Sequence, residues 1–398
     1  MTEQVMKEIH EGYLLITDIT GYTTYLSDSE LKHAQATLTA LLELIVENTR
    51  SPLIITRLAG DAVISYGLHE DFFLGQTFIE KLEDTYVAFR KALERLVLNN
   101  TCRCNACANI SNLDLKFFVH FGTFGIQRIS NYDELVGNDI NLLHRLLKNN
   151  VTDATGIRAY SLYTKSAIQK LGVEDLGDTM TLHNEEDEHL GNIPVFVQDM
   201  HPVWEKKRES TTVGFPYDRL IAKFVIEINM PRERVWDYLA QPRFRNILIG
   251  SDKMEVTNRV HGRITDGSVY QCYHGDKWVP HTILEWQPFE RIIVKESYIV
   301  HGVSALNEYQ LETTESGTRF TRWYAKPTGP FPWGALFLLL TPGYRWFGKK
   351  YLETFKLEIE NDYRSRSVGR ERNGEFAENQ ILKAAENSLH ASSDGQNA

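Results

Sequence analysis

The N-terminal fold is indicated by Tyr-Leu-Leu-Ile-Thr-Asp-Ile-Thr-Gly-Tyr-Thr at residues 13–23. The first part, Tyr13–Thr17, is a short apolar run of the kind that forms a buried strand. The run ends at Asp18. We therefore expect a buried strand that carries a carboxylate at its end.

A hairpin is predicted farther along the chain. Leu53–Thr56 and Ala62–Tyr66 are rich in strand-forming residues, and the turn between them contains Gly60, which supplies turn geometry. Asp61 lies in the same turn. If this hairpin pairs with the first strand, Asp18 and Asp61 meet at one edge of a sheet.

This pair of carboxylates has two interpretations. With a backbone carbonyl nearby, Asp18 and Asp61 form a reasonable Mg²⁺ or Mn²⁺ site for phosphate chemistry. Alternatively, both residues are structural, because aspartate is common at strand ends and Gly-Asp is an ordinary turn. The two residues alone leave both interpretations open.

The rest of the first half mixes helical and strand patterns. Ser29–Asn48 and Phe78–Leu98 carry apolar residues at helical spacing. The other predicted elements are strands over Leu113–Phe121, Gly125–Ile129 and Gly156–Ser161, and helices over Asn138–Lys148 and Leu162–Leu171. Together they predict an α+β layer structure in which helices cover one sheet.

One predicted helix carries a pair of polar residues. Asn141 and Arg145 are four residues apart, so they share a helix face. An amide and a guanidinium presented together can hold a ribose and a phosphoryl group in a charged transition state. The alternative interpretation is an ordinary solvated helix face.

Four segments together resemble the catalytic domain of the class III adenylate/guanylate cyclases. They occur in the family's order, at plausible spacings and on matching element types. The resemblance covers roughly Gly12 to Leu171 and implies a ferredoxin-like α+β fold. The segments are Asp18–Thr23, Arg57–Val63, Val119–Gly122 and Gly137–Arg145.

The resemblance implies a role for each matching residue. Asp18 and Asp61 match the aspartates that bind Mg²⁺ or Mn²⁺, and Ile19 matches the residue that lends a backbone carbonyl. Asn141 matches the asparagine that orients the ribose, and Arg145 matches the arginine that stabilises the transition state. In the implied reaction the metals polarise the 3′-hydroxyl of a nucleoside triphosphate, its oxygen attacks the α-phosphorus, and pyrophosphate leaves.

Three positions depart from the family's pattern. Arg57 stands where adenylyl enzymes usually have the lysine that reads the purine, and Glu134 stands where its aspartate partner is expected. These residues leave the nucleobase open. The family's later phosphate-binding lysine falls near Ile157, with Arg158 adjacent. Because the family's sites form between two such domains and this chain carries one, the resemblance implies a head-to-tail homodimer.

A cysteine cluster follows the second long helix. Cys102, Cys104 and Cys107 can bind Zn²⁺ if a further ligand completes the site, such as His33 or His120. The other interpretation is three reduced cysteines in a tight loop, because the spacing is not a common zinc-ribbon form.

The chain changes character after the first half, where an acidic run begins at Glu185. A second fold is then predicted. The expected divisions are a cyclase-like domain at 1–183, a linker at 184–216, a second domain at 217–364, and a polar, disordered tail at 365–398.

The second domain is predicted to be a strand, a helix, a run of strands and one long helix. Its strands are expected over Leu220–Ile228, Gly267–Tyr273, His281–Trp286, Arg291–Ile299, Ala305–Leu311 and Thr318–Ala325. The first helix is expected to begin at Pro231, and the closing helix to run from Trp333 to Tyr363.

This order resembles the START-like, or polyketide-cyclase-like, helix-grip superfamily. The resemblance rests on Phe224–Ile228, Pro231–Leu239 and Trp286–Ile292. It implies a cavity for an apolar small molecule or lipid between the sheet and the last helix. Tyr270, Cys272 and His274 share one strand face, and the sequence leaves open which face points inward.

Composition narrows the function classes. The 398 residues carry a net charge of −10, which gives no broad electrostatic footprint for nucleic acid or an anionic membrane. The most apolar stretch, Pro332–Leu340, is too short to span a bilayer. The N-terminus lacks a signal pattern, so we expect a cytoplasmic protein. Because of the net charge, we expect no nucleic-acid partner.

Three functions remain open from the sequence. The leading one is a metal-dependent nucleotidyl cyclase with an attached ligand-binding domain. The second is a catalytically degenerate nucleotide sensor or dimerisation module, favoured by Arg57 and Glu134. The third makes the C-terminal domain the functional part and the first half a scaffold.

Overall fold

The computed structural model describes residues 9–27, 31–69, 72–73, 75–98, 105, 109–129, 132–188, 191–300, 302–334, 339 and 341–367. The chain divides into two compact units, and the division falls between Glu209 and Ser210. Each unit combines helices with one sheet and has its own hydrophobic core. The expected α+β class is therefore confirmed.

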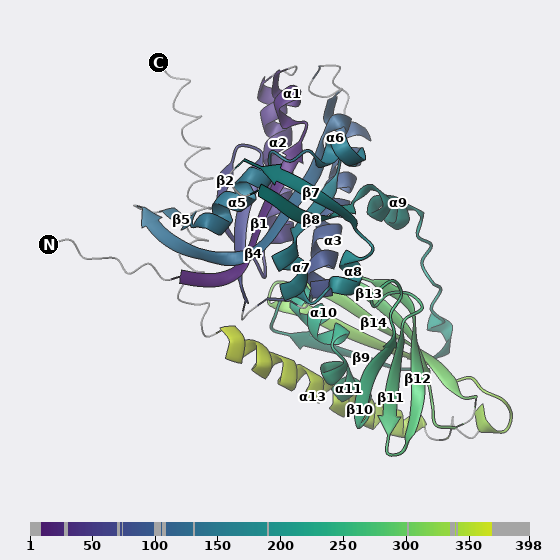
Figure 1. Ribbon diagram of the computed structural model, residues 1–398. Coiled ribbons are helices and arrows are strands. Elements are labelled where there is room, and N and C mark those ends of the chain that lie inside the picture. The colour runs from purple at the N-terminus through teal and green to yellow at the C-terminus, as the bar shows by residue number, and fades with distance from the viewer. Residues whose placement is uncertain are drawn as a thin grey trace. The chain divides into compact units, whose positions relative to one another are not determined.

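The first unit has the following described elements (Figure 1). Its strands are β1 (Ile9–Thr20), β2 (Ile54–Ala59), β3 (Ala62–Leu68), β4 (Asp114–Ile129), β5 (Tyr132–Val136), β6 (Tyr160–Thr164), β7 (Thr181–Asp187) and β8 (Gly191–Asp199). Its helices are α1 (Tyr22–Ser27), α2 (Leu31–Thr49), α3 (Gly75–Leu98), α5 (Asn138–Leu146), α6 (Val151–Thr155), α7 (Lys165–Leu171), α8 (Glu174–Gly177) and α9 (His201–Glu209).

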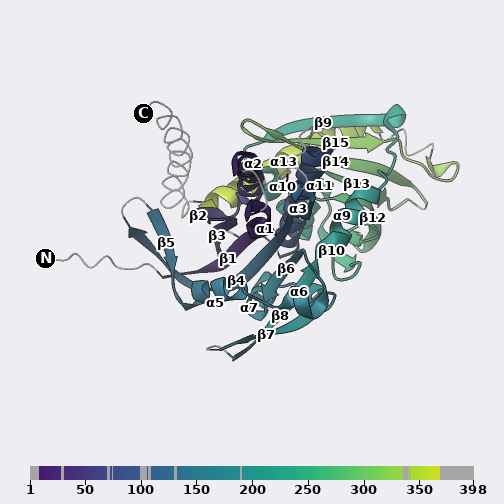
Figure 2. The same cartoon turned by 90° about the horizontal axis from the view of Figure 1, so that it is seen from above.

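The sheet of the first unit has its two faces covered by different helices. The strand order is β2-β3-β1-β4-β6-β8-β7, and β5 pairs with β4, beside which it lies as an arm in Figure 2. Along β1, Tyr13 and Leu15 pack in the core built with α2 and α3, whereas Leu14 and Ile16 pack in the core built with α5. This alternation places Asp18 on the same face as Leu14 and Ile16.

Three predicted strands differ from the structure. The strands expected over 113–121 and 125–129 are one strand, β4, because Gly122 lies directly opposite Gly12 of β1 and the pairing continues to Gly125. The strand expected over 156–161 begins only at Tyr160. Gly156 instead ends α6, with a φ of 78° that favours glycine.

The predicted linker over 184–216 is wrong in its first part. The acidic run belongs to β7, which pairs with β8, and β8 joins the main sheet beside β6. Helix α9 then closes the unit by burying Trp204. The charged residues of β7 misled the prediction because β7 is an edge strand, where charged side chains reach solvent.

The second unit has one sheet and a long helix (Figure 1). Its strands are β9 (Leu220–Ile228), β10 (Lys253–Asn258), β11 (Val269–His274), β12 (Lys277–Gln287), β13 (Arg291–Ser297), β14 (Ser304–Thr314) and β15 (Gly317–Ala325). Its described helices include α10 (Arg232–Ala240), α11 (Pro242–Ile249) and α13 (Thr341–Ser367).

The core of this unit lies between the sheet and its helices. The strands form an antiparallel sheet in the order β10-β11-β12-β13-β14-β15-β9. Leu352, Phe355 and Ile359 of α13 are fully buried in the same cluster as Trp236 of α10. Two short elements, β10 and α11, were not predicted from the sequence. The closing helix was expected to begin at Trp333, which lies next to residues outside the described part.

Other expectations also fall outside the described residues. They are the three cysteines at 102, 104 and 107 and the tail beyond residue 367. Residues 365–367 belong to α13. None of the described helices is long and apolar enough to cross a membrane.

Candidate functional sites

The strand pairing brings Asp18 beside Asp61. Strand β3 is antiparallel to β1, and Ala62 lies directly opposite Asp18. The backbone N–H of Ile19 donates a hydrogen bond to the carbonyl oxygen of Asp61 at 3.2 Å. Gly60, with a φ of 69°, makes the turn that returns the chain to this edge. The expected meeting of the two carboxylates is therefore confirmed.

The surroundings of Asp18 and Asp61 disfavour the charged form of each carboxyl group. Burial, and secondly the charge of Asp61, raises the pKa of Asp18 to about 6. Burial also raises the pKa of Asp61. Two adjacent carboxylates that are held partly out of water gain from a divalent cation, and carboxylate and carbonyl oxygens are the ligands that Mg²⁺ and Mn²⁺ prefer. The donor set of Asp18 and Asp61, with the nearby backbone of Ile19, fits such an ion.

A lysine that the sequence analysis missed completes this first group. Lys116 lies opposite Asp18 in the β1–β4 pairing, and its ammonium is 3.4 Å from Oγ1 of Thr152 and 4.9 Å from the centre of the Tyr160 ring. Burial lowers the pKa of Lys116, and Asp18 opposes that shift. A lysine inside the apolar segment Leu115–Phe121 was the signal that could have identified it.

Arg158 belongs to the surroundings of this group. It is exposed, and its positive charge is one of the causes that lower the pKa of Lys116. The expected lysine position falls at Ile157, which is partly buried. The structure therefore places Lys116 beside Asp18, and Arg158 near Lys116, although that lysine is missing.

A second group is built on α5. Asn141 and Arg145 are both exposed on this helix, as their spacing predicts. The start of the helix is fixed by Asp139, whose Oδ2 accepts a hydrogen bond from the backbone N–H of Thr123 at 2.6 Å. Gly137 precedes the helix with a φ of 144°, a conformation that favours glycine. The helix is therefore well positioned to present its two polar side chains.

The two residues expected to recognise the base contact each other. Nη1 of Arg57 is 2.8 Å from Oε1 of Glu134, and both side chains remain partly exposed. His144 of α5 lies near this pair: burial lowers its pKa, the charge of Arg57 lowers it further, and Glu134 opposes the shift. The sequence analysis missed His144, which carries no distinguishing motif. Arg57, Glu134 and His144 form, with the exposed face of α5, the second group.

His120, one of the histidines considered as a zinc ligand, lies within the described residues, whereas the three cysteines do not. Nδ1 of His120 is 2.9 Å from Oγ1 of Thr164, and Nε2 is 3.3 Å from Oδ1 of Asp139. The Nδ1 contact lies at the start of α7, and the Nε2 contact reaches Asp139 at the start of α5. Within the part of the chain that the structure describes, no group of three or more histidine, cysteine, aspartate or glutamate side chains is arranged to hold a metal.

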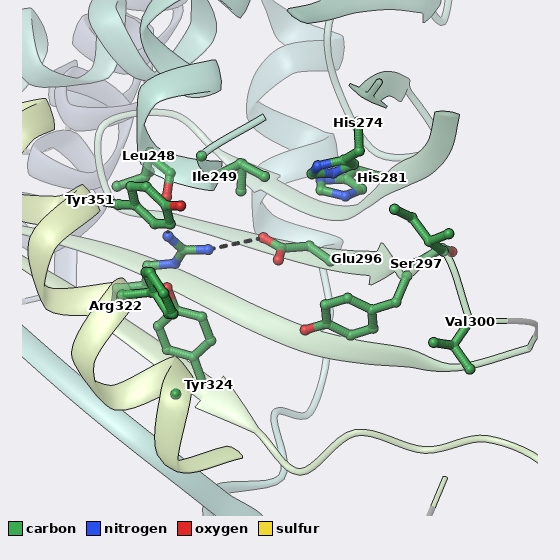
Figure 3. Close-up of a pocket in the computed structure, with 16 residues that line it drawn as sticks. Leu248, Ile249, His274, His281, Glu296, Ser297, Val300, Arg322, Tyr324 and Tyr351 are labelled. Atoms are coloured by element: carbon green, nitrogen blue, oxygen red, sulfur yellow. Dashed lines mark hydrogen bonds and ion pairs between the residues drawn. The ribbon is translucent and has the colours of Figure 1, made fainter. Parts of the chain in front are cut away.

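A cavity of about 520 Å³ lies within the second unit, between the sheet and α13 (Figure 3). Much of its wall is apolar, from Leu248, Ile249, Ile299, Val300 and Phe347. The side chain of His274 lines the cavity, and Cys272 of the same strand face is fully buried. This settles that the face shared by Tyr270, Cys272 and His274 points inward.

Comparisons with known proteins cover part of the chain. Residues 38–155 match a family described as a protein of unknown function (DUF2652). The uncharacterized protein Rv2561/Rv2562 of Mycobacterium tuberculosis (strain ATCC 25618 / H37Rv) is 38% identical over 63 residues, which are 16% of this chain and 30% of that protein.

Several solved structures of cyclases are similar to about half of this chain. A bacterial light-regulated adenylyl cyclase is 14% identical, with a TM-score of 0.37 over 52% of this chain and 58% of that one. The adenylyl cyclase CyaB from P. aeruginosa is 12% identical, with a TM-score of 0.36 over 49% of this chain and 97% of that one. The guanylyl cyclase Cya2 is also 12% identical, with a TM-score of 0.36 over 53% of this chain and 97% of that one. This chain spans less than two thirds of the mycobacterial protein and of the light-regulated cyclase.

Proposed function

We propose that the N-terminal unit is a metal-dependent nucleotidyl cyclase of the class III type. The observation that carries this proposal is the first group of residues. Asp18 and Asp61 meet at one sheet edge with raised pKa values, and Lys116 lies directly opposite Asp18. Carboxylates for a divalent cation beside cations for a triphosphate are the combination that this chemistry requires.

The first group binds the reacting phosphates. Asp18 and Asp61 hold Mg²⁺ or Mn²⁺, which, when bound, supplies positive charge to the triphosphate and acidity to the ribose 3′-hydroxyl. The backbone of Ile19 lies next to Asp18 at the same end of β1. Lys116, which lies beside Asp18, and Arg158, which lies near Lys116, neutralise oxygens of the triphosphate. Each of these groups stabilises charge that is already present or that develops during the reaction.

The second group orients the nucleoside. Asn141 positions the ribose, and Arg145 stabilises the pentavalent transition state. A bond forms between the 3′-oxygen and the α-phosphorus, the bond from that phosphorus to the bridging oxygen breaks, and pyrophosphate leaves with that oxygen. Arg57 and Glu134 face the base, and opening of their ion pair frees a guanidinium and a carboxylate to hydrogen-bond its edge.

A complete site is formed by two copies of the chain. The electrostatic neighbours of Asp18 are Asp61 and Lys116, whereas those of His144 are Arg57 and Glu134. The residues thus form two half-sites on one unit. A head-to-tail homodimer joins the first group of one copy to the second group of the other and generates two equivalent sites.

The competing function is a nucleotide sensor without turnover. Its support is the closed ion pair of Arg57 with Glu134, because two groups that satisfy each other offer less to a base. This alternative keeps nucleotide binding and removes only the chemistry, so the two functions make different predictions for a single assay.

That assay incubates the purified full-length protein with Mn²⁺ and each of ATP, GTP, CTP and UTP, followed by chromatography. We expect one or more cyclic nucleotides, and we expect Asp61→Asn to abolish them. The matched control is Asp175→Asn, which changes an exposed aspartate in α8 of the same unit. Saturable nucleotide binding without any cyclic product supports the sensor. The absence of both nucleotide binding and cyclic product contradicts the cyclase and the sensor alike.

A second function is supported for the C-terminal unit, namely ligand binding in a helix-grip domain. The antiparallel sheet, the long helix α13 across it and the cavity between them support this proposal. A volume of about 520 Å³ is within the range of small-molecule pockets. Saturable binding of an apolar probe to the full-length protein is expected, and its absence across a panel of lipids and alcohols would contradict this function.

A further inference from the structure

The inner end of the C-terminal cavity is polar and deeply buried. Three of its lining residues, His281, Glu296 and Arg322, are 3%, 4% and 2% exposed. They lie on the strands β12, β13 and β15, and Figure 3 shows all three directed into the cavity. We call these three residues the polar floor. Such groups are costly to bury in an apolar pocket unless they meet partners there.

The contacts within the polar floor leave some of its atoms without partners. Arg322 donates hydrogen bonds from Nη1 to the carbonyl oxygen of Leu248 at 2.6 Å and from Nη2 to Oε1 of Glu296 at 3.3 Å. Tyr309 donates to the same Oε1 at 2.7 Å. Among the described residues, Nε of Arg322 and Nδ1 of His281 have no hydrogen-bond partner. Both residues line the cavity, so the floor retains unused hydrogen-bonding capacity beside it.

The charge of this region is positive. A second guanidinium, that of Arg245 on α11, is 1% exposed and lies 5.3 Å from the Tyr309 ring that contacts Glu296. Two buried guanidiniums thus share one buried carboxylate. His281 does not change this balance of charge, because burial lowers its pKa to about 4 and it is therefore neutral at pH 7. His274, on the neighbouring strand β11, is the other titratable histidine that lines the cavity.

A ligand that carries one negative charge balances this excess. It replaces the missing partners of Arg322 and His281, and its charge compensates the second guanidinium. A cationic ligand meets two repelling guanidiniums, and a neutral ligand leaves the excess charge uncompensated. The apolar wall of Leu248, Ile299 and Phe347 then accommodates the rest of the molecule.

We propose that the C-terminal cavity binds an apolar molecule that carries a single carboxylate, and that Arg322 and His281 of the polar floor recognise this group. The inference rests on the proposed ligand-binding function of the cavity and adds the chemical class of the ligand. It differs from a general affinity for apolar molecules because it predicts an order of affinity among molecules with the same chain and different heads.

The test uses dodecanoate, dodecan-1-ol and dodecylammonium, which share one chain length. Calorimetric titration of the full-length protein at pH 7.5 is expected to give dodecanoate at least tenfold tighter binding than the alcohol, with the ammonium weakest. Equal binding of acid and alcohol, or preference for the ammonium, overturns the inference and leaves ligand binding intact. Failure of all three to bind contradicts ligand binding itself.

A variant identifies the residues responsible. Replacing the internal ion pair by Arg322→Gln with Glu296→Gln removes both charges together and avoids leaving either one unpaired. We expect this variant to lower the preference for dodecanoate severalfold, because the Arg322 donor is lost while the charge of Arg245 remains, and to retain binding of the alcohol. Retained preference in a folded double variant overturns the assignment of Arg322.

The matched control is Arg319→Gln with Glu227→Gln. This ion pair joins Arg319 of β15, the strand that carries Arg322, to Glu227 of the neighbouring strand β9, with an Nε–Oε1 distance of 2.8 Å, but its side chains are exposed on the other face of the sheet. It should leave the affinities of all three probes unchanged. If the internal double variant fails to fold, the order of affinities in the unaltered protein still decides the inference.

Discussion

Asp18→Asn is expected to stabilise the N-terminal unit at neutral and alkaline pH. Burial, and then the charge of Asp61, raises the pKa of Asp18 to about 6, whereas an aspartate in an unfolded chain titrates near about 3.9. The fold therefore favours the protonated carboxyl. The stability contributed by this preference is complete below a pH of about 4 and is lost as the pH rises through about 6. Asparagine does not titrate and avoids the loss.

The size of the effect follows from the same pKa. A difference of roughly two units corresponds to about 3 kcal/mol. Asp18 is only partly buried, and solvent screening reduces the expected gain to about 1–2 kcal/mol. For a unit of about 200 residues, each 1 kcal/mol shifts the melting temperature by about 2–4 °C, so Asp18→Asn should melt about 2–8 °C higher at pH 8.

Scanning calorimetry of the full-length protein at pH 4 and pH 8 measures this difference. The gain should be present at pH 8 and nearly absent at pH 4, and Asp175→Asn should show neither. Added Mn²⁺ should raise the melting temperature of the unaltered protein more than that of Asp18→Asn, since the variant lacks one carboxylate. A variant that is less stable at pH 8, or whose gain is the same at both pH values, refutes the assigned environment of Asp18.

Three further predictions concern other parts of the chain. Arg57→Ala removes an exposed ion pair, so it should change the free energy of unfolding by less than about 1 kcal/mol. It should nevertheless alter the relative rates with the four nucleoside triphosphates in a competition assay. Unchanged rates would exclude Arg57 from base recognition. Trp236→Ala should destabilise the C-terminal unit by about 3–5 kcal/mol in denaturant unfolding, because Trp236 is fully buried with its ring 4.6 Å from that of Trp286; a cost below 1 kcal/mol would contradict that packing. If the cysteines bind Zn²⁺, Cys104→Ser should lose the metal in elemental analysis, and a zinc-free unaltered protein with normal melting would reject the zinc hypothesis.

The sequence predicted elements well where one local signal decided them. The run from Tyr13 to Thr17 and the turn at Gly60 were sufficient to expect the pairing that joins Asp18 to Asp61. It did not predict β7, because an edge strand can be highly charged and then resembles a linker. It predicted two strands over 113–121 and 125–129, although the pairing with β1 continues through Gly122.

Residues recruited by tertiary packing were harder to foresee. Lys116 stands out locally as a lysine in an apolar strand, but it belongs to the first group only because β4 pairs with β1. His144 approaches Arg57 and Glu134 through the packing of α5, which single-sequence patterns do not reveal. The polar floor needs three strands in register, so His281, Glu296 and Arg322 cannot be associated by spacing alone.

The most direct test of the shared nucleotidyl cyclase site is complementation between two inactive variants. Asp18→Ala and Arg145→Ala should each be inactive alone. When equal amounts exchange subunits at random, half of the dimers are mixed and each mixed dimer has one intact site of two, so activity should recover to roughly a quarter of the unaltered protein.

The control mixes the double variant with the unaltered protein in equal amounts. Mixed dimers then have no intact site, so activity should be roughly a quarter of that given by the same total amount of unaltered protein, whereas sites contained within single chains would give roughly half. Recovery in the first mixture with a quarter in the second is the predicted result. No recovery in the first mixture, with half in the second, would contradict a site shared between two copies.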